Sequence, residues 1–167
     1  MDIRIIKGER TDRIEARRSD GSSVGFDFQH KGPIPHDVVH LVVEDVLGIT
    51  EGFWGLLARG MEPHAIGEMA KAAGHVSAKR ALKPEPSIVP IVQAERIVEA
   101  FEADLWGGGS SNEAEREMIR GGCEQSLVPV PAISDEQIER VRAALSDFRD
   151  RWAGSAAGMA EQLSWAG

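Results

Sequence analysis

The spacing of the apolar residues changes near residue 31, and this change constrains the fold more than any other feature of the chain. Before it, Val24, Phe26 and Phe28 alternate with small or polar residues, which is typical of a strand with one buried face. After it, apolar residues recur every three or four positions, as in helices that pack by one side. The sequence therefore predicts an α+β fold, a mostly helical bundle with a small N-terminal antiparallel β-meander.

Residues 1–31 contain the signals of that meander. A short apolar stretch begins at Ile3, and polar and apolar residues alternate over 13–17. Between this segment and the one at 24–28 lies Ser19-Asp20-Gly21-Ser22, a turn signal, because glycine accepts a positive φ and aspartate bonds its own backbone. We expect a hairpin or three-stranded sheet whose apolar face packs on the helices.

Prolines and glycines divide the remainder into predicted helices. They cover 36–47, 51–59, a segment from Pro63 toward Gly74, 88–105, and a segment that opens with a capping box at Ser134 and Gln137. We expect a single domain over 1–167. It divides into a β-meander (1–31), helices carrying the candidate site (32–106), a flexible Gly/Ser loop (107–111) and C-terminal helices (112–167).

The composition excludes several classes of protein. The formal net charge of −8 disfavours binding to the phosphates of nucleic acid. No run of about 18 apolar residues is present, so we expect no membrane span, and the N-terminus lacks the apolar region of a signal peptide. The single cysteine, Cys123, cannot form an internal disulfide, which predicts a reducing, cytoplasmic location.

The strongest chemical signal lies in the predicted helix 36–47. His36, His40 and Glu44 are four residues apart and therefore project from one helix face, on the flank of a valine stripe, with Asp37 beside them. Imidazole and carboxylate groups are common ligands of divalent metal ions. The His-Glu-x-x-His pattern of zinc proteases is absent, because Asp37 follows His36. The segment predicts a metal site, or alternatively two helix-flank histidines bonded to their neighbours.

The same stretch resembles a known motif. His36-Asp37-x-x-His40, followed by Glu51, is similar to the zinc motif of the coenzyme Q biosynthesis family, His-Asp-x-x-His followed by Glu. The resemblance implies a helical protein that binds zinc near a lipid-like substrate. It makes His36, Asp37, His40 and Glu51 the implied ligands, and it is confined to residues 36–51.

Further candidates come from other segments. His64 in the next helix is an additional ligand or an exposed histidine, and His30 is a loop histidine that could reach the site. Three glutamates of the 88–105 helix could complete a metal shell if that helix faces His36 and His40, and otherwise form a solvated face: Glu95, Glu99 and Glu102. Cys123 would need a base within hydrogen-bond reach to act as a nucleophile.

Two hypotheses on function remain open at this level. In the first, the chain is a helical protein that binds a divalent metal such as zinc, and could be a small metalloenzyme acting on a small molecule, with Glu44 or Glu51 as third ligand or general base. In the second, it is a non-catalytic homodimeric interaction module with structural histidines, which associates through the edge of the meander or the helix stripe that contains Trp152.

Overall fold

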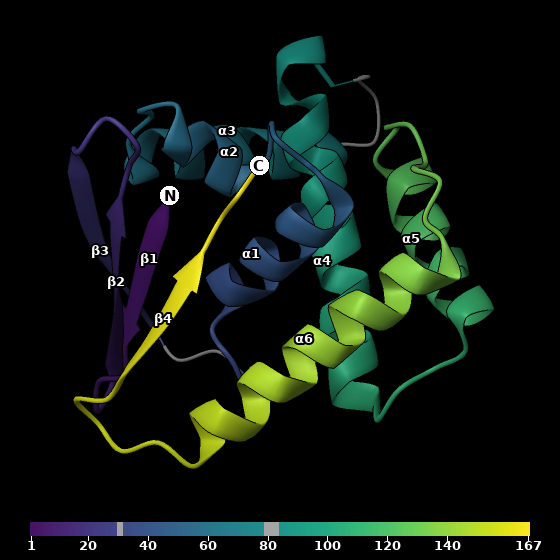
Figure 1. The fold of residues 1–167 in the computed structure, drawn as a ribbon. Helices are drawn as coiled ribbons and strands as arrows, with labels where there is room; N and C mark the ends of the chain where they lie inside the picture. The colour runs from purple at the N-terminus through teal and green to yellow at the C-terminus, as the bar shows by residue number, and fades with distance from the viewer. Residues whose placement is uncertain (30–31, 79–83) are drawn as a thin grey trace.

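Helices cover one face of an antiparallel sheet in the computed structural model, which describes residues 1–29, 32–78 and 84–167 (Figure 1). The sheet has the strand order β3-β2-β1-β4, with every neighbouring pair antiparallel. Its strands are β1 (Asp2–Ile6), β2 (Thr11–Arg17), β3 (Ser23–Gln29) and β4 (Ala160–Ser164). The expected α+β fold with an N-terminal antiparallel meander is confirmed.

The meander follows the alternation of its sequence. Ile3, Ile5 and Ile14 are completely buried on the face that meets the helices, and Ile5 lies opposite Ile14 in the register of β1 and β2. The turn between β2 and β3 contains Gly21 at a φ of +86°, a conformation that glycine adopts without steric cost. One side of the sheet therefore belongs to the hydrophobic core, while the other is polar.

The fourth strand corrects our expectation for the C-terminal part. We predicted helices over 112–167, but Ala160–Ser164 pairs with β1, so that Leu163 lies opposite Ile3. The strand is short and contains little alternation, so its conformation depends on the partner strand rather than on a local signal. The N-terminal amine donates to the Trp165 carbonyl at 2.8 Å, and the two termini lie side by side (Figure 1).

The helices begin and end close to the predicted positions. They are α1 (His36–Leu47), α2 (Phe53–Ala58), α3 (Pro63–Ala78), a short 3-10 helix η1 (Pro86–Ile88), α4 (Val89–Gly107), α5 (Asn112–Gln125) and α6 (Asp135–Ala153). The expected capping box at Ser134 and Gln137 is present at the start of α6. Gly48 ends α1 in the left-handed conformation. Among the described residues, no helix has the length and apolar character needed to cross a bilayer.

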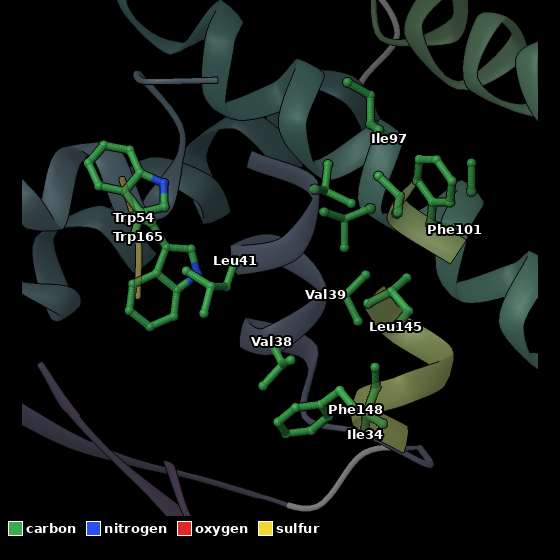
Figure 2. Packing of buried hydrophobic residues seen from close by; sticks show 14 of the residues in the cluster. Ile34, Val38, Val39, Leu41, Trp54, Ile97, Phe101, Leu145, Phe148 and Trp165 are labelled. Atoms are coloured by element: carbon green, nitrogen blue, oxygen red, sulfur yellow. The ribbon is translucent and has the colours of Figure 1, made fainter. Parts of the chain in front are cut away.

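Helix α1 lies at the centre of the helical layer and packs against α2, α4 and α6. In Figure 2, Val39 lies next to Leu145 of α6, and Leu41 lies next to Trp165. All four side chains belong to one hydrophobic core that also includes the inner face of the sheet. Because α1 is held on several sides, the polar residues on its remaining flank have a fixed position.

A buried charge cluster joins α4, α5 and α6. The Arg142 guanidinium of α6 binds Asp104 of α4, with Nε 2.8 Å from Oδ2, and its Nη2 lies 3.5 Å from Oε2 of Glu115 in α5. Glu115 is completely buried, and its carboxylate oxygens accept no hydrogen bond from the part of the chain that the structure describes. Burial, together with repulsion by Asp104, raises the pKa of Glu115 to about 7.

Replacing Glu115 with Gln should reduce the pH dependence of stability. The folded-state pKa of about 7 lies above the ordinary value of 4.5, so the folded protein binds the extra proton. The stabilisation is complete below pH 4.5 and is lost as the pH rises through 7, by about 2–3 kcal/mol between pH 5 and 8. Urea unfolding across this range should show this loss in the parent protein and a smaller loss in E115Q. Glu113→Gln, an exposed change in the same helix turn, is the control. Equal pH slopes in the parent and in E115Q would contradict the prediction.

Candidate metal centre

The N-terminal half of α1 and the middle of α4 bring three metal-ligating side chains together. His36 and His40 come from α1, and Glu95 comes from the facing side of α4. One ligand atom from each of the three lies within 4.8 Å of the others. The four-residue spacing places both imidazoles on one face of α1, and the packing of α1 on α4 supplies the carboxylate.

Each imidazole is held at Nδ1 by a second carboxylate. His36 Nδ1 lies 2.8 Å from Oε1 of Glu102, and His40 Nδ1 lies 3.3 Å from Oε1 of Glu44. With the proton on Nδ1, each ring donates to its glutamate and keeps the lone pair of Nε2 free. Carboxylate partners of this kind orient metal-binding histidines and fix their tautomer.

Both Nε2 atoms face the same third carboxylate. His40 Nε2 lies 3.4 Å from Oε1 of Glu95, and His36 Nε2 lies 3.9 Å from Oε2 of Glu95. The two rings meet edge to face, with their centroids 4.8 Å apart. The arrangement thus directs two nitrogen donors and one oxygen donor toward a common position, a donor set that suits a divalent transition metal.

The same groups interact strongly in the absence of a metal. Burial alone would lower the pKa of His40, but hydrogen bonds to Glu44 and Glu95 and their charges raise it to about 10. Burial acts to raise the pKa of Glu95, yet the neighbouring histidines lower it overall. An imidazolium at His40 therefore balances the carboxylates, and a bound cation would have to displace that proton.

Glu44 has a second role in the scaffold. The residue is only 1% exposed, and its carboxylate accepts the backbone N–H groups of Phe53 at 2.8 Å, Trp54 at 2.9 Å and Gly55 at 3.4 Å. These groups form the N-terminus of α2, which has no side-chain cap of its own. A Cβ atom on Gly52 would lie 2.5 Å from the Glu44 carboxyl carbon, so a bare glycine makes room for this contact.

The other predicted ligands do not belong to this group of three. Asp37 lies beside His36, and burial raises its pKa, but its carboxylate is outside the group of three. Glu44 is occupied by backbone N–H groups, and Glu51 is exposed before the start of α2. His64 is also exposed.

The remaining candidates lie apart as well. Glu99 is exposed and pairs with Arg96 at 2.8 Å. Cys123 is buried, which raises the pKa of its thiol to about 11 and does not favour a nucleophilic thiolate. His30 lies outside the described residues.

From the sequence, we expected Glu95 and Glu102 to contribute to the site only if their helix faces His36 and His40. The condition is met, because α4 packs on α1 with both carboxylates directed at the histidines. Their seven-residue spacing is the available signal, since it places two acids on one helix face beside the apolar stripe. The helical period alone does not predict which other helix packs against that face.

Comparison with models of protein families, with curated proteins and with solved structures finds no match for this chain. The resemblance to the coenzyme Q biosynthesis family thus stays a prediction. The ligand set that it implies shares His36 and His40 with the observed group. The carboxylate in the observed group is that of Glu95, whereas the implied carboxylates are those of Asp37 and Glu51. The geometry of the site therefore carries the functional argument.

Replacing Glu44 with Ala should destabilise the fold. The change leaves buried N–H groups at the start of α2 without an acceptor and removes the partner of His40 Nδ1. We expect a loss of about 2–4 kcal/mol in the free energy of unfolding, measured by urea denaturation at pH 7. The matched control is Glu51→Ala, an exposed change near the same helix start that should leave the stability nearly unchanged. A similar effect of both changes would argue against the capping role.

Proposed function

We propose that this protein binds one divalent transition-metal ion through Nε2 of His36, Nε2 of His40 and a carboxylate oxygen of Glu95. The single observation that carries the proposal is the orientation of the imidazoles. Both rings are anchored at Nδ1 by glutamates, and both direct Nε2 at a third carboxylate. A simple ion-pair network does not require this common orientation, whereas a metal site does.

Zinc is the metal that we propose first. Two histidines and one glutamate form a known three-ligand set for catalytic zinc, which keeps a fourth position for water or substrate. Non-haem iron(II) and manganese use similar donors and are the nearest alternatives. A bound metal of this kind polarises a carbonyl or phosphoryl oxygen, or lowers the pKa of a coordinated water.

The residues around the donors would have positioning roles. Glu102 and Glu44 hold the two imidazoles, and Glu44 also ties the site to the start of α2. We considered Glu44 and Glu51 as general bases. Both oxygens of Glu44 already accept backbone N–H groups and Glu51 is exposed outside the group, so the proposal assigns the base to neither. The reaction class proposed is metal-assisted chemistry on a small molecule.

A second candidate function is a non-catalytic interaction module with structural histidines. The pKa of His40 favours it, because a protonated imidazole between two carboxylates also joins α1 to α4 without a metal. Among the described residues no strand pairs with the outer edge of β3, and strand edges of this kind can pair with a second copy. A homodimer through β3 is the form that this alternative takes.

The setting of the protein is part of the same proposal. The single cysteine favours a reducing compartment, and we propose the cytoplasm. A formal net charge of −8 argues against nucleic acid as the partner and favours a small-molecule ligand.

Metal titration by calorimetry separates the two candidates. Protein purified without a metal-affinity tag and treated with a chelator should bind one zinc ion per chain. The variants His40→Ala and Glu95→Gln should bind zinc at least about a hundredfold more weakly, because each loses a direct ligand. His64→Ala removes an exposed histidine on α3 and should bind like the parent protein. Circular dichroism checks that all variants are folded.

The positioning role of Glu102 has its own expected result. Glu102→Ala removes the partner of His36 Nδ1 and should weaken zinc binding roughly tenfold to a hundredfold, less than the loss of a ligand. Glu102→Gln can still accept the hydrogen bond and should recover part of the affinity.

A parent protein without stoichiometric zinc, iron or manganese binding would overturn the proposed function and favour the interaction module.

A further inference from the structure

A hollow of about 440 Å³ lies beside the candidate metal centre, between the end of β3, the start of α1 and the end of α4. Its described walls are Phe28, Gln29, His36, Asp37, Glu102 and Trp106. The size is that of a small-molecule site. His36 belongs to both places, because its Nε2 faces Glu95 while its ring forms part of the wall of the hollow.

Trp106 is an exposed aromatic side chain with a defined position. It is 61% exposed, whereas the other three tryptophans of the chain are buried. Its ring lies against the backbone of Gly32, where a Cβ atom would be 2.8 Å from Cζ2 of the indole. Trp106 is not part of the hydrophobic core. A large aromatic surface at the mouth of a hollow is typical of a binding site.

The described wall of the hollow contains two acidic side chains beside the imidazole of His36. Asp37 and Glu102 are the acidic residues of its described wall, and that wall contains no lysine or arginine. Phe28 and Trp106 contribute aromatic rings, whose faces carry partial negative charge. Carboxylates next to aromatic faces attract organic cations and repel anions, while an uncharged ligand lacks this charge attraction.

We propose that this hollow binds a small organic cation, a quaternary ammonium compound or a protonated amine. The cationic group lies against the indole of Trp106 and within the field of Asp37 and Glu102, and the remainder of the ligand extends toward His36. A role of this ligand as the substrate would rest on the proposed metal centre. The binding of the cation in the hollow does not rest on it. The test therefore uses the metal-free protein, so that the two proposals can fail separately.

Choline and 3,3-dimethylbutan-1-ol form a matched pair of probes, because they have nearly the same shape and only choline carries a charge. Titration of the chelator-treated protein, followed by tryptophan fluorescence and calorimetry, should show saturable binding of choline. The fluorescence should respond, since Trp106 is the exposed tryptophan. The uncharged alcohol should bind at least about tenfold more weakly. Equal affinities, or no choline binding at millimolar concentration, would overturn the proposal.

Variants assign the binding to this hollow. Trp106→Leu should abolish measurable choline binding, whereas Trp106→Phe keeps an aromatic face and should retain most of it. Asp37→Asn should weaken the binding of choline but not that of the alcohol. Glu113→Gln removes an exposed acid on α5 and should bind choline like the parent. Unchanged choline binding in Trp106→Leu would place the ligand elsewhere and overturn the proposal. Zinc titration of Trp106→Leu should match that of the parent, whatever the choline result.

Discussion

The buried carboxylate of Glu44 joins the scaffold of this protein to its candidate site. Its oxygens accept the first backbone N–H groups of α2, and one of them also lies within reach of His40 Nδ1. Burying a carboxylate costs free energy unless its charge is satisfied, and at Glu44 a helix N-terminus and an imidazole satisfy it. The orientation of His40 thus depends on the position of α2, and the start of α2 depends on a side chain of α1.

Helix α1 carries these contacts because it lies in the middle of the helical layer. Its apolar residues pack toward the other helices and toward Trp165 (Figure 2), which leaves one polar flank against α4. This packing places the donor atoms of His36 and His40 next to Glu95. A site built on two packed helices can therefore keep donor atoms in place without a ligand.

The two proposals share the ring of His36. One uses its Nε2 as a donor, and the other uses its ring as part of the wall of a hollow that contains Trp106. Glu102 connects them, because it holds His36 Nδ1 and also lines the hollow. A cation in the hollow would lie next to a carboxylate that orients a proposed metal ligand, and this contact would let the two binding events influence each other.

Local patterns in the sequence were enough to predict α1, the antiparallel meander and the common face of His36 and His40. Each of these depends on the spacing of apolar residues, on turn residues and on helix ends, which are signals that lie within a few residues of each other in the sequence. Only the tertiary structure decided that Glu95 lies with His36 and His40, that Glu44 caps α2 and that Ala160–Ser164 pairs with β1. These contacts join segments far apart in the chain, and they depend on how helices and strands pack against each other. The helical period places Glu95, Glu99 and Glu102 on one side of α4 and does not distinguish between them. The packing of α4 on α1 brings only Glu95 and Glu102 into contact with the histidines.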